Sequence, residues 1–273
     1  MKTITIATLK GGAGKTMTLF NLAGVLAESN KVLLIDVDPQ CNLSNNCGID
    51  SSNLNQPTIY DIFKKYNPST QPTAESIIVK HPIEELPNLD IIPSSLNLFF
   101  IEEEMINLEG RTKILSQFFK RNEKVLKEYN YILMDTNPSM SIFNLNAFYA
   151  ADSIILTTDV SFNGVKGVEM FCALWDAKRD QINATSDFKK EDNIDALIIS
   201  NFDKRPNLSK DLVEYLNSME FADGLVCSTK VPATVKLKNT ELAHKPINVL
   251  LPSGDADMAI RNLVNDLKDK GVI

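Results

Sequence analysis

Cysteine and histidine are scarce in this sequence. There are four cysteines, Cys41, Cys47, Cys172 and Cys227, and none is separated from another by only two residues. The two histidines, His81 and His244, are remote from them in the chain. This spacing disfavours a metal centre built on cysteine and histidine, and we expect reduced thiols in a cytoplasmic protein.

The sequence also lacks a long apolar run and an excess of positive charge. No stretch approaches the roughly 18 apolar residues that a membrane-spanning helix needs. Residues 1–6 alternate apolar and polar side chains and lead directly into a glycine-rich loop, so they do not resemble a signal peptide. The formal net charge is −7. Any contact with nucleic acid must therefore come from a local basic patch.

The chain does contain a regular alternation of strand and helix patterns. Short apolar runs at 4–8, 31–35, 89–92, 131–134, 153–157 and 196–200 predict strands, and helical spacing appears at 16–28, 165–182, 208–219 and 256–268. This order predicts an α/β fold with a doubly wound, mostly parallel sheet. We expect one domain over 1–273, with an irregular insertion at about 51–88 and a helical flank at about 96–129, broken near Gly110.

The glycine-rich loop "KGGAGKT" follows the first strand and opens the first helix, as a phosphate-binding loop (P-loop) requires. Glycines let the backbone curl so that several N–H groups face one anion, and the helix adds its positive end. Lys15 is expected to reach the β- and γ-phosphates and Thr16 to ligate Mg²⁺. The predicted nucleotide contacts here are Lys10, Gly11, Gly12, Ala13, Gly14, Lys15, Thr16 and Met17. The generic pattern places glycine at position 9, which is Leu9, and does not require Lys10.

Three acids follow predicted strands. Asp135 ends the strand at 131–134, where a Walker B carboxylate holds Mg²⁺ directly or through water. Asp36 and Asp38 follow the strand at 31–35, on the sheet edge where α/β proteins bind ligands. A carboxylate there can orient a water against the γ-phosphate, although strand-end acids also cap ordinary turns.

Together, "KGGAGKT", "IDVDPQCN", "YILMDTNPS" and "AADSIILTTD" resemble the deviant Walker ATPases of the ParA type, which partition plasmids and chromosomes. "TIYDIF" and "LDIIPSSLNL" extend the resemblance, which runs from residue 1 to about 252. The resemblance implies ATP and Mg²⁺ as cofactors and a P-loop fold. It also implies an ATP-bound sandwich dimer that coats nucleoid DNA and a centromere-binding, ParB-type partner that stimulates weak hydrolysis.

The resemblance also assigns roles to residues. Lys10 would cross the dimer to the partner's ATP, Lys15 would act on the phosphates, and Asp38 would position the attacking water. The implied metal-site residues are Thr16, Asp36, which supports Mg²⁺ and the switch region, and Asp135. The implied adenine contacts are Asn201, Val231 and Pro232.

Three positions depart from the family pattern. Met17 replaces a second threonine, which removes a side-chain contact to phosphate but leaves the backbone N–H. Asn137 replaces the first proline of the switch after Asp135, and Ala233 occupies a position that is often basic. The expected DNA-binding residues are nevertheless several bases in an acidic chain: Lys204, Arg205, Lys230, Lys236, Lys238 and Lys245. The alternative for these lysines is an ordinary solvated surface.

Related functions remain as alternatives. A MinD-like, membrane-positioning ATPase shares the core but ends in a basic amphipathic helix, whereas the last predicted helix here carries a net acidic face, so we expect no membrane partner. A nitrogenase-type iron protein needs two cysteines per subunit to bridge a cluster, and Cys41 and Cys47 lie in the wrong region. A tyrosine kinase of this group needs a tyrosine-rich tail, and none follows Tyr215. We expect no N-terminal helix-turn-helix domain and therefore no specific operator binding by this chain alone.

Overall fold

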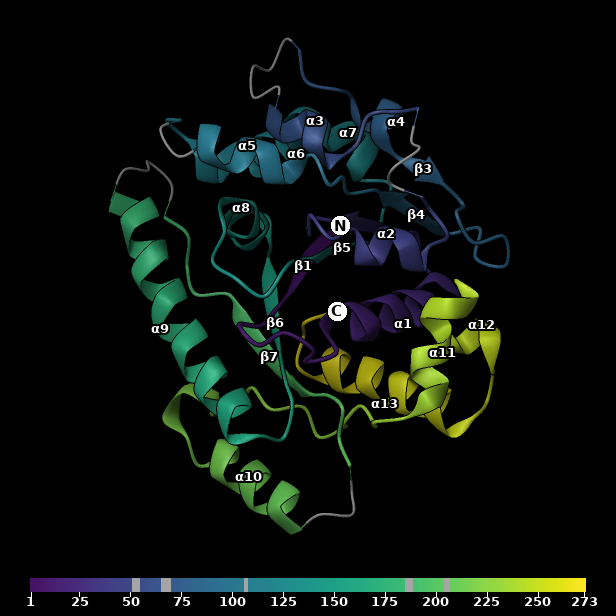
Figure 1. Cartoon of the computed structure of the whole chain (residues 1–273), viewed down its shortest axis with the longest axis vertical. Helices are drawn as coiled ribbons and strands as arrows, with labels where there is room; N and C mark the ends of the chain where they lie inside the picture. The colour runs from purple at the N-terminus through teal and green to yellow at the C-terminus, as the bar shows by residue number, and fades with distance from the viewer. Residues whose placement is uncertain (51–54, 65–69, 106–107, 185–188, 204–206) are drawn as a thin grey trace.

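A single seven-stranded sheet organises the computed structural model of the chain (Figure 1). The structure describes residues 1–273 apart from 51–54, 65–69, 106–107, 185–188 and 204–206. The strand order is β3-β4-β2-β5-β1-β6-β7, and every neighbouring pair is parallel except β3 and β4. The strands are β1 Lys2–Ala7, β2 Val32–Asp36, β3 Val79–Lys80, β4 Leu89–Ile92, β5 Tyr131–Asp135, β6 Ser153–Thr158 and β7 Ile194–Ile199.

The central strands are buried on both faces, which is why they read as continuous apolar runs in the sequence. All residues of β2 and β6 are buried. β1 lies between β5 and β6, and the register places Ile6 opposite Asp135 on one side. On the other side of β5, Asp36 of β2 lies opposite Asp135. The carboxyl ends of β1, β2 and β5 therefore bring the glycine loop and the predicted acids to one edge of the sheet.

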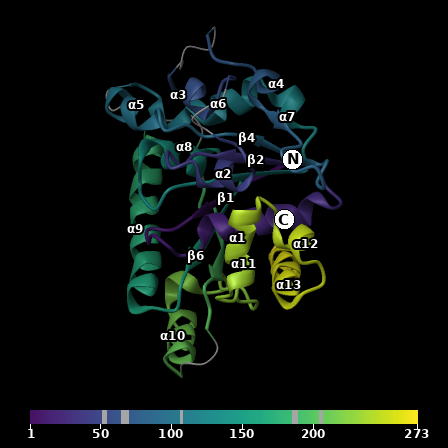
Figure 2. The ribbon, with the colours of Figure 1, turned by 45° about the vertical axis from the view of Figure 1, so that its right-hand side comes forward.

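Helices cover both faces of the sheet (Figure 2). One face packs against the helices that begin and end the chain, and its core joins Leu34 and Leu133 of the strands to Leu22 and Leu263. The helices on this face are α1 Lys15–Ala27, α2 Asn42–Asn46, α11 Val235–Ala243, α12 Ile247–Leu250 and α13 Asp255–Asp269.

The opposite face carries two further core clusters. One joins β2 and β5 to helices from the middle of the chain, and the other packs Trp175 and Phe171 against Phe148 beneath β6 and β7. These helices are α3 Ile59–Lys64, α4 Ala74–Ile77, α5 Leu98–Met105, α6 Ile114–Arg121, α7 Glu123–Leu126, α8 Ile142–Ala150, α9 Phe162–Ala184 and α10 Asn207–Asn217. Two 3-10 turns, η1 Arg111–Lys113 and η2 Glu220–Ala222, complete the elements.

The fold confirms the predicted doubly wound, mostly parallel sheet and corrects several details. The flank at 96–129 contains more than two helices, because the stretch after Gly110 is interrupted again at Asn122. The antiparallel strand β3 was not predicted. Neither were α2, α8 and α11, whose polar or mixed composition gives little helical periodicity. Among the described residues, no helix is long and apolar enough to cross a bilayer.

Candidate nucleotide-binding site

The glycine loop between β1 and α1 is shaped by two backbone positions that require glycine. Gly12 has φ of +78° and Gly14 has φ of +69°, in the left-handed region that disfavours other residues. A Cβ at Gly14 would also lie 3.0 Å from Ser200 Oγ. Ser200 Oγ donates to the carbonyl of Ala13, and Asn201 Nδ2 donates to that of Gly12 at 2.9 Å. The chain after β7 therefore holds the loop in its curled form.

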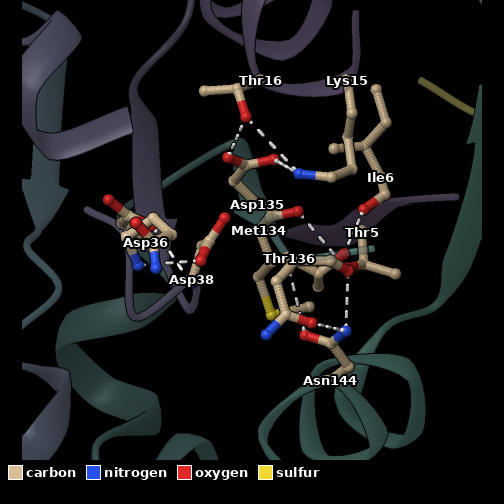
Figure 3. A network of polar contacts seen from close by, with 12 residues as sticks. Thr5, Ile6, Lys15, Thr16, Asp36, Asp38, Met134, Asp135, Thr136 and Asn144 are labelled. Carbon is tan, nitrogen blue, oxygen red and sulfur yellow. Dashed lines mark hydrogen bonds and ion pairs between the residues drawn. The ribbon is translucent and has the colours of Figure 1, made fainter. Parts of the chain in front are cut away.

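Three side chains meet directly behind the loop (Figure 3). Lys15 Nζ contacts Asp135 Oδ1 at 2.6 Å, and Thr16 Oγ1 donates to Asp135 Oδ2 at 2.6 Å. Lys15 is 7% exposed and Asp135 is fully buried. The hydroxyl, ammonium and carboxylate of the predicted P-loop and Walker B positions are thus in contact, although Asp135 lies more than a hundred residues along the chain.

The side chain of Asp36 accepts hydrogen bonds from the segment that follows β2. Its Oδ2 accepts from the N–H of Ser44 at 2.8 Å and from Ser44 Oγ at 2.7 Å, and its Oδ1 accepts from the N–H of Asp38 at 3.2 Å. Complete burial, with the nearby charge of Asp135, raises the pKa of Asp36 to about 7. Burial also raises the pKa of Asp38, whose Oδ1 accepts from the N–H of Gln40 at 2.9 Å.

These groups surround a cavity of about 460 Å³, which is large enough for a nucleotide. The cavity lining consists of Thr8, Lys10, Gly11, Gly12, Ala13, Gly14, Lys15, Thr16, Met17, Asp38, Asn42, Asn46, Pro138, Asn201, Lys238 and Glu241. Asp36 and Asp135 are fully buried next to it. Every predicted contact of the loop is in the lining, and so are Asp38 and Asn201.

The residues fit a magnesium–nucleotide complex. Asp36, Asp38 and Asp135 lie close enough to shift the pKa values of Asp36 and Asp38, and Lys15 is the cation in contact with this group. Within the described part of the chain, no cluster of three or more His, Cys, Asp or Glu side chains is arranged to hold a metal alone. Mg²⁺ in such sites takes one or two protein ligands together with phosphate and water, and Thr16 and Asp135 are placed to supply them.

Lys10 has an intramolecular partner. Its Nζ contacts Asp159 Oδ2 at 2.5 Å and Ser161 Oγ at 2.8 Å, at the start of α9. The side chains of Lys10 and Asp159 are 32% and 25% exposed, so the pair lies at the rim of the cavity. Neither Asp159 nor Ser161 was singled out in the sequence, because the contact joins residues about 150 positions apart.

Two positions that depart from the family pattern, Met17 and Asn137, make well-defined contacts in the structure. Met17 is 8% exposed and joins the core of the α1 face, so its side chain replaces a polar contact with packing. Asn137 is held by Asn144 of α8, whose Nδ2 donates to the Asn137 carbonyl at 2.8 Å and to Oδ1 at 2.7 Å. Asn144 Nδ2 also donates to the carbonyl of Ser139 at 2.8 Å. Side-chain hydrogen bonds thus constrain the loop where the family uses proline.

Two predicted adenine contacts lie elsewhere. Val231 is fully buried in the core, and neither Val231 nor Pro232 lines the cavity. The N–H of Val231 donates to the carbonyl of Ile199 at 2.9 Å, and that of Phe202 donates to the carbonyl of Val231 at 2.9 Å. The two residues therefore pair through their backbone with the end of β7 and the loop that carries Asn201, and their contact with adenine stays a prediction.

The predicted DNA-binding residues that the structure describes have different surroundings. Lys238 lines the cavity instead, and Lys245 Nζ forms an ion pair with Glu85. Lys230 Nζ donates to the carbonyl of Ser228 at 3.2 Å, while Lys236 is exposed on α11. Lys204 and Arg205 lie outside the described residues.

Sequence comparisons agree with this geometry, which defines the chain as a P-loop protein. A family model described as an AAA domain matches residues 1–189. The chromosome partitioning protein ParA of Myxococcus xanthus is 30% identical over 245 residues, covering 89% of this chain and 80% of that protein. The sporulation initiation inhibitor protein Soj of Bacillus subtilis is 29% identical over 272 residues, covering 99% of each. The chain belongs to the ParA-type P-loop ATPases.

Solved structures share the fold. Apo McdA of Cyanothece superposes with a TM-score of 0.81 at 22% identity, over 98% of this chain and 99% of that one. A plasmid partition protein of Borrelia burgdorferi, solved with AMPPNP, has a TM-score of 0.76 at 25% identity, over 98% of this chain and 99% of that one. The predicted P-loop fold of the deviant Walker type is therefore confirmed.

Proposed function

We propose that this chain is an ATP-dependent DNA-partition ATPase that works as an ATP-bound dimer. The observation that carries the proposal is the contact of Lys15 and Thr16 with Asp135 beneath a curled glycine loop, with Lys10 at the rim. The names of the M. xanthus and B. burgdorferi relatives, a chromosome and a plasmid partition protein, support a partition role.

In this proposal the loop binds the triphosphate of ATP. The backbone N–H groups of residues 11–16 and the N-terminus of α1 face the phosphates, and Lys15 exchanges part of its contact with Asp135 for a phosphate oxygen. Thr16 and Asp135 hold Mg²⁺, which supplies charge neutralisation at the phosphates when bound. Asp36 supports this site indirectly, because its oxygens are engaged by the backbone of Asp38 and Ser44.

Hydrolysis then depends on Asp38. Asp38 lines the cavity beside the loop, and its raised pKa suits a carboxylate that accepts a hydrogen bond from an attacking water. Its Oδ1 is oriented by the N–H of Gln40, which fixes the direction of the carboxylate. Lys15 stabilises the negative charge that develops on the transferred phosphoryl group.

Dimerisation brings in Lys10. A lysine at the rim of a nucleotide cavity is placed to reach across a two-fold interface once it leaves Asp159 and Ser161. In this proposal each Lys10 contacts the phosphates bound to the partner subunit. The ATP-bound dimer binds DNA through its exposed lysines without sequence preference on the nucleoid, and a ParB-type protein stimulates hydrolysis and release.

The test is DNA binding and oligomeric state at graded salt concentrations with ATP, ADP or no nucleotide. We expect an ATP-specific dimer whose affinity for DNA falls steeply as salt rises. Lys10→Ala should bind ATP but fail to dimerise. Lys31→Ala, at an exposed position just before β2, should behave as the unmodified protein. Equal, weak DNA binding in all three nucleotide states would contradict the partition function, and normal dimerisation of Lys10→Ala would contradict the role of Lys10.

A further inference from the structure

Asn46 is a buried polar residue whose amide group is not satisfied by the protein. It ends helix α2, is 7% exposed and lines the nucleotide cavity. Its Nδ2 has no hydrogen-bond partner among the described residues. Buried amide groups of this kind are rare because loss of water is costly when no partner replaces it. Asn46 was not singled out by any motif in the sequence.

The side of the cavity that contains Asn46 is polar, and its two helices are joined by a hydrogen bond. It consists of Asn42 and Asn46 of α2 together with Lys238 and Glu241 of α11, and all four line the cavity. His244 at the end of α11 makes a hydrogen bond from Nδ1 to the carbonyl of Asn45 at 2.7 Å, which joins the two helices. We call these four residues the α2–α11 wall.

Helix α11 is in turn tied to α1. Asn21 Nδ2 lies 3.5 Å from Thr240 Oγ1, and Asn21 Oδ1 accepts from the N–H of Ile247 at 2.7 Å. The same asparagine donates to the carbonyl of Met17 at 2.8 Å, in the first turn after the loop. The α2–α11 wall is therefore fixed relative to the phosphate-binding loop, so its side chains are positioned before a ligand enters.

The chemistry of the wall differs from that of the loop. The loop offers backbone N–H groups, Lys15 and Thr16, which suit phosphate. The wall adds the ammonium group of Lys238, the side-chain amides of Asn42 and Asn46, of which Asn46 Nδ2 is unpaired, and the carboxylate of Glu241. A carboxylate repels phosphate, but it accepts hydrogen bonds from hydroxyl groups, as acidic residues do for ribose in other nucleotide sites. A sugar hydroxyl is both a donor and an acceptor, so it can donate to a carboxylate such as Glu241 or accept from an amide such as that of Asn46.

We propose that the α2–α11 wall binds the sugar of the nucleotide, with Asn46 Nδ2 donating to a ribose hydroxyl and the Glu241 carboxylate accepting from one. This assignment rests on the proposed nucleotide function of the cavity and adds selectivity against nucleotides that lack the bound hydroxyl. The unpaired amide of Asn46 is the structural basis for this selectivity, because it gains its partner when the ribonucleotide binds.

The test compares dissociation constants for ATP, 2′-deoxyATP, 3′-deoxyATP and ITP by titration calorimetry. The unmodified protein should bind ATP about tenfold more tightly than at least one deoxy analogue, because a site that pairs a hydroxyl rejects the analogue without it. Asn46→Ala should weaken ATP binding by a similar factor and lose the preference. Glu241→Ala, at an exposed position, should also reduce the preference, while Asn45→Ala on the exposed side of α2 should retain it.

Thermal unfolding without nucleotide provides a second readout. Removal of an unpaired buried amide should leave the unfolding temperature of Asn46→Ala unchanged or raised, whereas a merely structural asparagine would lower it. Equal affinity of the unmodified protein for ATP and both deoxy analogues would overturn the sugar assignment while leaving the proposed function intact. If Asn46→Ala changed only the ratio of the dissociation constants for ATP and ITP, Asn46 would contact the base, and the sugar assignment would be overturned. Failure of the unmodified protein to bind any nucleotide would overturn the proposed function, and the sugar assignment with it.

Discussion

At the scale of single residues, Lys10 and Asp36 show two ways in which a charged side chain is committed before any ligand arrives. Lys10 is engaged at the rim by Asp159 and Ser161, and Asp36 is fully buried beneath the segment that contains Asp38. The resemblance to the ParA family predicted a function for Lys10, and the position of Asp36 at the end of a predicted strand suggested one for Asp36. Neither observation could predict their partners, because Asp159 follows β6 and meets Lys10 only when β6 pairs with β1.

The ion pair of Lys10 predicts a variant with easier dimerisation. Asp159→Asn removes the charge that holds Lys10 within its own subunit. Because a partly exposed pair contributes little energy, we expect dimerisation at about threefold lower ATP concentration. Asp176→Asn, which removes a carboxylate on the exposed side of α9, is the matched control. Light scattering during ATP titration measures the effect, and an unchanged or weaker dimer for Asp159→Asn would count against the competition between the two Lys10 positions.

The pKa of Asp36 predicts a pH dependence of stability in the nucleotide-free protein. Its folded pKa is raised from 3.8 to about 7, so the folded protein binds this proton more tightly than the unfolded chain. The contribution of Asp36 to stability therefore declines as pH rises from about 4 to about 7. The difference in the free energy of unfolding between the unmodified protein and Asp36→Asn should shift against the unmodified protein between pH 5 and pH 7.5. Urea denaturation at both values measures it, and a constant difference would refute it.

At the scale of elements, α1 is the helix on which the site depends. Its first turn carries Lys15 and Thr16, and its later turns are covered by α12 and α13. The strand–loop–helix order made α1 predictable from the sequence. Helices α2 and α11, which build the other wall of the cavity, were not predicted, because α2 has only five residues and α11 has almost no amphipathic pattern. Their helical form depends on packing against α1, which local sequence does not reveal.

The close approach of α1 and α12 predicts opposite effects for two glycine substitutions. A Cβ at Gly24 would lie 2.5 Å from Asn248 Oδ1 and 2.5 Å from Pro246 Cβ. Gly24→Ala should therefore lower the free energy of unfolding by about 1–3 kcal/mol through overpacking. Gly167 lies in α9, and a Cβ added there would meet nothing within 4 Å, so Gly167→Ala should raise stability by about 0.5–1 kcal/mol. Denaturant unfolding of both variants checks the pair, and equal effects would contradict the packing argument.

At the scale of the whole molecule, the sequence predicts the fold well but does not locate a DNA-binding surface. The strand–helix alternation predicted the sheet, and the order of the motifs predicted the family, because both patterns extend over most of the chain. A DNA-binding surface could not be predicted in the same way, since the sequence does not show which lysines already have a partner or line the cavity. Lys238 lines the cavity and Lys245 pairs with Glu85, while Lys236 is exposed. With a net charge of −7, DNA binding must depend on a local basic patch.

This distribution predicts a small but measurable effect for Lys236. Lys236→Ala should weaken DNA binding by the ATP form and reduce the slope of log affinity against log salt concentration by about one. Lys124→Ala, at an exposed position on α7 on the opposite face of the sheet, is the control and should leave the slope unchanged. Fluorescence anisotropy with a short duplex at several salt concentrations measures both, and identical slopes for all three proteins would exclude Lys236 from the DNA contact.

The packing of α13 on α1 has a consequence for synthesis on the ribosome. Arg261 of α13 makes paired hydrogen bonds to Glu28 at 2.6 and 2.7 Å, and Leu263 and Leu267 join the core beneath α1. The phosphate-binding loop is translated before α13, and the part of α1 that packs on α13 stays uncovered until residues 255–269 have been translated. Because an uncovered apolar helix surface is prone to aggregate, this part of α1 must stay protected between its own translation and that of α13. The helix that follows the phosphate-binding loop is thus fully packed only after α13 has been made.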